Sequence, residues 1–220
     1  MNRETKVVNK LISITWEMKS AKESLERREE SRVEILKDAL LEKCSCETER
    51  AWQKCARELL KMNCVTQEEF LASVQELLEK GRGKYRNIIL TGPANCGKTF
   101  LLNPLNKIYR TFTNPASTSF AWVGAENAEA IFLNDFRWSP QIIPWQDFLL
   151  LLEDHVVHLP TPKSHFAKDI KFDTDTPIFC TSKQSLIMVK NGSLDERETE
   201  MAPDSSRKAT GNATVFFLFR

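Results

Sequence analysis

Glycine and proline are absent from residues 1–80 of the 220-residue chain, although the whole chain holds seven glycines and nine prolines. Both residue types break helices, and this stretch is rich in Glu, Lys, Arg, Leu and Ala, which favour them. We therefore expect residues 1–80 to form an all-helical region, with a role in assembly. The hydrophobic share of 41% and the charged share of 28% exclude collagen-like, low-complexity and fully disordered classes.

The chain also lacks a strong net charge, a long apolar run and a regular cysteine pattern. Its net charge of +1 gives no global field toward nucleic acid, so any basic surface must be local. No run approaches the ~20 apolar residues that span a bilayer, and no secretory signal pattern opens the chain. The six cysteines are too few and too irregular for a disulfide scaffold. We expect an intracellular protein, nuclear rather than cytoplasmic, without a membrane partner.

Three helical segments are expected in the first 80 residues. Residues 7–43 carry a sparse apolar stripe and form either one long helix or a partly frayed segment, and residues 48–62 form a second segment. The third begins at Thr66, which is followed three residues later by Glu69, the spacing of a helix N-cap. The cysteines here, Cys44, Cys46, Cys55 and Cys64, are not spaced like the paired knuckles of zinc sites, which favours free thiols.

From residue 87 onward, short apolar runs alternate with helical patterns, which predicts a parallel sheet with helical crossovers in a domain over residues 81–200. The expected strands are 88–90, 120–123, 130–133 and 178–181, and the expected helices are 98–110 and 144–154. Residues 201–220 show neither the helical nor the strand periodicity of apolar residues, apart from the apolar run 215–219. We expect them to form an irregular tail.

A phosphate-binding pattern, G-x-x-x-x-G-K-T, stands directly between the first strand and the following helix. Glycines let backbone N–H groups approach phosphates, and the helix start adds its positive end, so a chance glycine-rich turn is the weaker explanation. Lys98 would reach the β- and γ-phosphates, and the Thr99 hydroxyl would join the shell of Mg²⁺. The pattern predicts that ATP is bound by Gly92, Pro93, Ala94, Asn95, Cys96, Gly97, Lys98 and Thr99.

An acidic residue follows the next apolar strand, where Asn134 and Asp135 end the run 130–135. A carboxylate beside a phosphate loop holds Mg²⁺ or polarises water, which makes Asp135 a metal ligand together with Thr99 and a catalytic residue together with Lys98. The alternative is a buried strand that ends in an ordinary surface aspartate. The strand at 178–181 also ends in polar residues, but this signal is weak.

Three runs, GPANCGKT, IFLNDFRWSPQIIPWQDFLLLLE and TPIFCTSKQ, resemble in order and spacing the superfamily 3 helicases of small DNA viruses. The likeness covers residues 82–185, with parvovirus nonstructural proteins similar at the first run and circovirus replication proteins at the second. The resemblance implies an AAA-like P-loop NTPase with a five-stranded parallel sheet flanked by helices. It also implies a homo-oligomer, usually a hexameric ring, that threads a single strand using ATP. The nucleotide-loop residues Gly92, Gly97, Lys98 and Thr99 and the acidic Asp135 carry over.

The chain departs from the family pattern at two positions, and no residue carries over as the family's downstream arginine. The family often has two consecutive acids where this chain has Asn134 and Asp135, and it has an asparagine that orients water where this chain has Lys183. A charged lysine cannot accept a proton from water, whereas Mg²⁺ can be held by one carboxylate and the phosphates. We therefore expect nucleotide binding to survive these changes better than hydrolysis.

A DNA-contacting hairpin is implied by the resemblance for residues 155–171. Its basic residues Lys163, His165 and Lys168 would contact the backbone of single-stranded or forked DNA, and an ordinary solvated loop is the alternative. The basic cluster at 81–86 reads instead as a helix C-terminal cap and linker. The strand-nicking domain of such viral proteins has paired histidines and a tyrosine, which residues 1–80 lack.

The leading hypothesis is an ATP-binding, ATP-hydrolysing DNA helicase domain of a virus-like replication protein. The alternative is a nucleotide-binding interaction or regulatory module with little or no turnover, which fits Asn134 and Lys183. A small-molecule kinase on the same loop is less favoured, because the sequence offers no evident lid for an acceptor.

Overall fold

The computed structural model describes residues 2–42, 51–115, 120–160, 170–183 and 215–218, and the chain divides into two compact units, Met1–Lys43 and Cys44–Arg220. The division falls after Lys43, so the second and third helical segments of the expected region 1–80 share a unit with the sheet. None of the described helices is both long enough and apolar enough to cross a membrane.

The first unit contains helices α1 (Asn2–Glu29) and α2 (Arg32–Leu41). Ser31 caps α2: its hydroxyl accepts from the Glu34 N–H at 3.2 Å, while the Glu34 carboxylate accepts from the Ser31 N–H at 2.8 Å. Such a capping box satisfies free donors at a helix start. The interpretation of residues 7–43 as one long helix is therefore wrong, because the cap at Ser31 starts a second helix.

The second unit begins with α3 (Ala51–Met62) and α4 (Gln67–Lys80). The expected N-cap of α4 is confirmed, since the Thr66 hydroxyl accepts from the Glu69 N–H at 3.2 Å. The helix ends at Gly81, which has φ +70° and donates its N–H to a carbonyl of the last turn. A left-handed residue at this place favours glycine, and the expected cap at 81 is confirmed.

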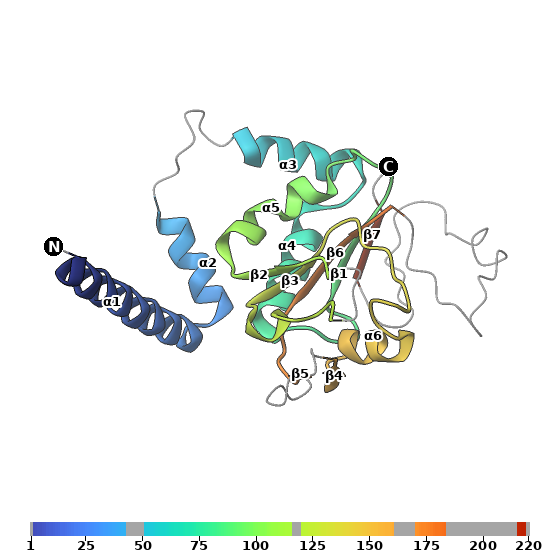
Figure 1. Ribbon diagram of the computed structural model, residues 1–220. Coiled ribbons are helices and arrows are strands. Elements are labelled where there is room, and N and C mark those ends of the chain that lie inside the picture. Colours follow the sequence, from blue (N-terminus) through green and yellow to red (C-terminus); the bar gives the residue numbers. More distant parts are fainter. Residues whose placement is uncertain (1, 43–50, 116–119, 161–169, 184–214, 219–220) are drawn as a thin grey trace. The chain divides into compact units, whose positions relative to one another are not determined.

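Five parallel strands form the central sheet in the order β2-β3-β6-β1-β7 (Figure 1). Their bounds are β1 Ile88–Thr91, β2 Thr111–Thr113, β3 Ala130–Leu133, β6 Ile178–Ser182 and β7 Val215–Leu218. Helices α5 (Lys98–Ile108) and α6 (Trp145–Leu152) lie between them in sequence. The expected mixed α/β architecture, with a parallel sheet flanked by helices, is confirmed.

The strand expected at 120–123 is wrong. These residues form turns that lead into the short helix η1 (Ala125–Asn127), and Trp122 is buried there with its indole N–H donated to the Ile142 carbonyl at 3.1 Å. The strand beside β3 is instead β2, whose Phe112 stacks on Trp122 with ring centroids 5.6 Å apart. The apolar run 120–123 thus covers the sheet edge without joining it.

Strand β7 is a second difference from the sequence prediction. It pairs with β1 in register Ile89 to Phe216, so residues 215–218 belong to the sheet although an irregular tail was expected over 201–220. Residues 201–214 and 219–220 of that tail lie outside the described residues. The run pairs with the fully buried strand β1 along one side and forms the last strand of the sheet order.

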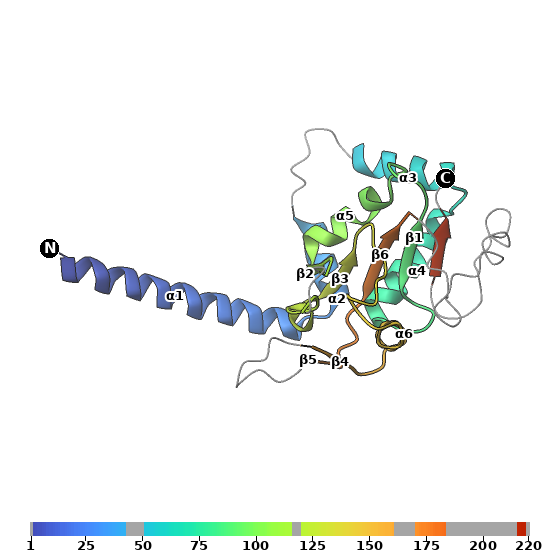
Figure 2. The same cartoon turned by 45° about the vertical axis from the view of Figure 1, so that its right-hand side comes forward.

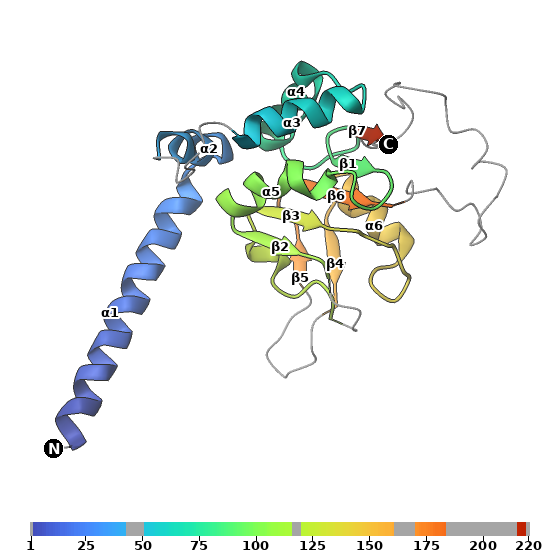
Figure 3. The same ribbon diagram turned by 90° about the horizontal axis from the view of Figure 1, so that it is seen from above.

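Helices α3, α4 and α5 cover one face of the sheet, and α6 lies on the other together with a two-stranded hairpin of β4 (Val157–Leu159) and β5 (Ile170–Phe172) (Figures 2 and 3). Because successive side chains of a strand point to opposite sides, each strand contributes side chains to the packing on both faces of the sheet. In β3, Ile131 and Leu133 join the core under α6, while Phe132 stacks on Phe179 at 4.9 Å toward α5.

Arg82, which follows the cap of α4, is fully buried. Its guanidinium donates to the carbonyls of Thr174 at 2.7 Å, Leu151 at 2.5 Å and His155 at 3.1 Å, and it lies over the Phe172 ring at 5.1 Å. These partners come from the end of α6 and from both sides of the hairpin. A single side chain therefore fixes the hairpin base to the sheet domain.

Candidate functional site

The functional residues expected from sequence lie mostly at one edge of the sheet. Because all five strands are parallel, their carboxyl ends meet there. The loop 92–97 follows β1, Asn114 follows β2, Asn134 and Asp135 follow β3, and Lys183 follows β6. The Gly92 N–H donates to the Ser182 carbonyl at 3.1 Å, which ties the loop to β6.

The loop between β1 and α5 depends on its second glycine. Gly97 has φ +84° and is the N-cap of α5. A Cβ at this position would lie 2.4 Å from a methyl carbon of Leu59 in α3. A side chain here would therefore face both a disfavoured backbone conformation and a steric clash. The sequence pattern places glycine at the position where α3 closes onto the loop.

Lys98 opens helix α5 and is nearly buried, with 5% of its surface exposed. Its ammonium donates to the carbonyls of Gly92 at 2.8 Å and Pro93 at 2.6 Å, and to the Cys96 sulfur at 3.3 Å. All three partners are uncharged, and Lys98 forms no ion pair with any described residue. The first turn of α5 contains no acidic residue either. The loop therefore encloses a positive charge without a negative partner.

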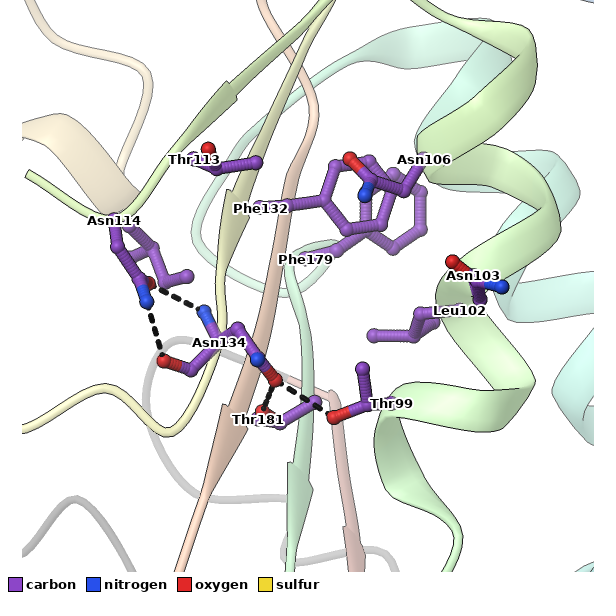
Figure 4. A pocket seen from close by; sticks show the side chains of 11 residues that line it. Thr99, Leu102, Asn103, Asn106, Thr113, Asn114, Phe132, Asn134, Phe179 and Thr181 are labelled. Atoms are coloured by element: carbon purple, nitrogen blue, oxygen red, sulfur yellow. Dashed lines mark hydrogen bonds between the residues drawn. The ribbon is translucent and has the colours of Figure 1, made fainter.

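The Thr99 hydroxyl points across to β3, where it donates to the Asn134 side-chain oxygen at 2.7 Å (Figure 4). The Thr181 hydroxyl of β6 donates to the same oxygen at 2.9 Å and accepts from the Asp135 N–H at 2.8 Å. Asn134 is therefore the residue that joins the loop to the ends of β3 and β6. Sequence reasoning assigned no role in the site to this side chain.

Asp135 adopts a left-handed conformation with φ +49°, which aspartate tolerates better than most residues. Its carboxylate lies 3.8 Å from the Lys183 ammonium, and both side chains are about half exposed, at 54% and 44%. The two residues thus form a surface ion pair at the same edge. The expected pair of Thr99 and Asp135 is brought to one edge, but the direct partner of Thr99 is Asn134.

A cavity of about 270 Å³ opens beside Thr99, between α5 and the ends of β2, β3 and β6 (Figure 4). Its lining carries no charge and consists of Thr99, Leu102, Asn103, Asn106, Thr113, Asn114, Phe132, Leu133, Asn134, Phe179 and Thr181. Asn114 exchanges two hydrogen bonds with the backbone of Asn134, at 2.8 and 2.6 Å. The sequence analysis did not predict a role for Asn114, because it did not predict strand β2, which Asn114 follows.

The donors around Thr99 do not fit a magnesium ion held by a protein carboxylate. The Asn134 oxygen has two lone pairs, and two hydroxyls already donate to it. The nearest acid in sequence, Asp135, contacts Lys183 and does not line the cavity. In the ranges that the structure describes, no group of three or more His, Cys, Asp or Glu side chains is arranged to hold a metal.

The expected nucleic-acid residues Lys163, His165 and Lys168 lie outside the described residues. The base of the expected hairpin is present, since β4 and β5 pair antiparallel in register His158 to Lys171. A hairpin in this interval is therefore confirmed, and its contacts with DNA stay a prediction.

The cysteines that were weighed as zinc ligands do not come together in the described chain. Cys55 and Cys64 are exposed free thiols, while Cys44 and Cys46 lie outside the described residues. Cys180 is buried in β6, and this burial raises the pKa of its thiol.

Fold and site together define a mixed α/β protein in which a glycine-bounded loop leads from the central strand of a parallel sheet into a helix. The loop holds a buried ammonium, and an uncharged cavity adjoins it. No family model matches the chain, and no curated protein is significantly similar to it.

Proposed function

We propose that the sheet unit is a P-loop domain that binds ATP through residues 92–99. The observation that carries this proposal is the buried ammonium of Lys98, which has only neutral partners. Burying an unpaired charge is unfavourable, and an anion removes that cost. The N-terminal end of α5 adds its own positive potential at the same place, since it has no side-chain cap. A triphosphate supplies the missing negative charge.

Within this class, the proposed role is that of a superfamily 3 helicase-like domain of a virus-like replication protein. The order of elements supports it: the hairpin β4–β5 lies between β3 and β6 in sequence, in the interval where the family carries its DNA-binding hairpin. In this role the protein is a homo-oligomeric ring that acts on single-stranded or forked DNA through Lys163, His165 and Lys168. Lys98 would offset phosphate charge and Asp135 would orient water.

A second candidate, a nucleotide-binding module with little turnover, is favoured by two contacts. Thr99 meets an amide at Asn134 where the family has an acid, and Asp135 is engaged by Lys183 at 3.8 Å. An amide accepts no proton from an attacking water, and the Asp135 carboxylate is already occupied by the Lys183 ammonium. Both contacts reduce hydrolysis more than binding.

Calorimetric titration of the full chain with ATP tests the binding that both candidates share. The wild type should bind, and Lys98→Ala should weaken binding at least about tenfold, because hydrogen bonds to a charged group contribute roughly 1.5–3 kcal/mol. The matched control is Lys107→Ala, which removes an exposed lysine from the last turn of the same helix. Equal affinities for the two variants, or no heat with the folded wild type, would contradict the proposal.

Steady-state ATP hydrolysis with and without single-stranded DNA separates the two candidates. Turnover that rises with DNA and disappears in Lys98→Ala is expected for the helicase domain. Binding without turnover in either condition is expected for the module.

A further inference from the structure

We propose that this site binds the nucleotide phosphates without a divalent cation ligated by a protein carboxylate, and that the Asn134 amide group donates to the terminal phosphate in its place. The inference rests on the proposed nucleotide binding and concerns how the phosphates are held. It starts from the side chains beside Thr99, which include no carboxylate to hold magnesium.

Asn134 is oriented by its neighbours. The Asp135 N–H donates to the Thr181 hydroxyl, which in turn donates to the Asn134 oxygen, and the Thr99 hydroxyl donates to the same oxygen. Both lone pairs of that oxygen are thereby used. The amide nitrogen makes no hydrogen bond to any described residue, although Asn134 lines the cavity. The free groups at this position are therefore two N–H donors, which attract phosphate oxygens and cannot ligate a cation.

The polar part of the cavity, at Thr99, Asn134 and Thr181, is where the inference places the terminal phosphate. A volume of about 270 Å³ is smaller than the ~300–1,000 Å³ of pockets that enclose a drug-sized ligand, so a whole nucleotide does not fit inside. The lining combines amide and hydroxyl groups with the apolar side chains of Leu102, Phe132, Leu133 and Phe179, and it has no carboxylate that would repel an anion. Lys98 precedes Thr99 in the sequence, and its ammonium donates to neutral groups of the loop. Its positive charge attracts the phosphates next to Thr99.

Binding of ATP to the full chain in excess Mg²⁺ and in excess EDTA tests the inference. For the wild type, the two dissociation constants should agree within about threefold. Asn134→Asp keeps an oxygen for the Thr99 and Thr181 hydroxyls and replaces the N–H donors by a charged oxygen. That variant should bind at least about tenfold more weakly in EDTA than in Mg²⁺.

Asn103→Asp is the matched control, because Asn103 lines the same cavity from α5 and has no bond to Thr99. It adds the same charge and should not create the same dependence on Mg²⁺. Wild-type binding that is lost in EDTA overturns the inference and leaves the proposed function standing. Absence of binding in both conditions overturns the proposed function, and the inference with it.

A different observation, in the first unit, carries a second inference. Helix α1 exposes a line of apolar residues at alternating spacings of four and three: Val7, Leu11, Ile14, Met18, Ala21 and Leu25. The large side chains of this line are 41–69% exposed. A strict seven-residue repeat of this kind is the seam of a left-handed coiled coil. The line is called the α1 seam below.

We infer that the α1 seam pairs with the α1 seam of a second copy of this chain, with the two helices parallel. Charge complementarity selects this partner. Glu17 and Lys22 flank the seam on opposite sides and are five residues apart, so in a parallel, in-register pair Glu17 of each helix faces Lys22 of the other. Both residues are exposed, and their present partners lie in their own helix: Glu17 accepts from the Ser13 hydroxyl at 3.1 Å, and Lys22 lies 3.6 Å from Glu26. Exposed pairs of this kind are weak, so they exchange readily for a partner across the seam.

The mass of the nucleotide-free full chain in solution, measured by light scattering, tests the pairing. The wild type should have twice the 25.3 kDa of one chain, and Met18→Lys should have the mass of one chain. The matched control is Trp16→Lys, since Trp16 is 65% exposed beside Met18 at 69% but lies outside the seam. It should keep the doubled mass.

Charge reversal tests the parallel orientation. Glu17→Lys alone should weaken the pair, and Glu17→Lys combined with Lys22→Glu should restore it, because opposite charges again face each other. A wild-type mass of one chain at about 100 μM would overturn the inference. An equal loss of mass in Trp16→Lys and Met18→Lys would do so as well.

Discussion

Replacement of Arg82 by methionine should destabilise the sheet unit more than any surface change nearby. Methionine has a similar length and fills the same space, but it leaves the carbonyls of Thr174, Leu151 and His155 without their donor. A buried acceptor that loses its partner costs about 1–3 kcal/mol, and three carbonyls lose theirs at once. The Asp154 carboxylate, 3.5 Å from Arg82, is 39% exposed, so its loss of a partner adds little. We expect a loss of about 4 kcal/mol in the free energy of unfolding.

Urea denaturation measures this loss. With a slope of about 2 kcal/mol per molar urea, a loss of about 4 kcal/mol lowers the midpoint by about 2 M. Arg82→Lys should fall between wild type and Arg82→Met, because a point charge cannot serve three carbonyls in the plane of a guanidinium.

The matched control is Lys84→Met, two residues away, where the side chain is 47% exposed and its partner Glu153 lies 3.7 Å away. An exposed ion pair contributes about 0–1 kcal/mol, so this midpoint should move by no more than about 0.5 M. Equal midpoint shifts for Arg82→Met and Lys84→Met would refute the reasoning that the buried guanidinium holds the hairpin base.

Three further predictions concern single residues. Gly97→Ala should lower the free energy of unfolding by about 1–2 kcal/mol in urea denaturation, because alanine disfavours φ +84°. Hydrogen bonds from Ser31 lower the pKa of Glu34 below its ordinary value of 4.5. The capping box therefore stabilises α2 fully at pH values above 4.5, and this contribution is lost as the pH falls through the lowered pKa. Ser31→Ala should raise the pKa of Glu34 in an NMR titration. ATP should slow the alkylation of Cys96, which contacts Lys98, and should leave the alkylation rate of the exposed Cys55 unchanged, as measured by peptide mass mapping. Equal rates at Cys96 with and without ATP would contradict ATP binding by this loop.

The loop 92–97 and its flanking strands could be predicted from sequence because their signals are local. The apolar run before Gly92 is β1, the glycine at 97 stands at a left-handed position, and the run ending at Leu133 is β3. Each of these elements is specified by residues next to one another in the chain. Thr66 and its N-cap were predictable for the same reason.

What could not be predicted depends on contacts between distant segments. Strand β2 has the short, polar-flanked sequence Thr-Phe-Thr, whereas Trp122 lies in a more strand-like run that packs against Phe112. In the sequence, Arg82 is one charge of a basic cluster that was predicted to be a linker. In the structure its side chain is buried and donates to carbonyls some 70 to 90 residues away. Which of Asn134 and Asp135 meets Thr99 depends on the left-handed turn at Asp135, which no local pattern signals.

Backbone amide shifts of the ¹⁵N-labelled full chain during titration with ATP test most directly whether residues 92–99 hold a triphosphate. The account predicts saturable shifts concentrated at 92–99 and the first turn of α5, and their loss in Lys98→Ala. Saturable shifts confined to other parts of the chain, or no shifts at millimolar ATP, would contradict it.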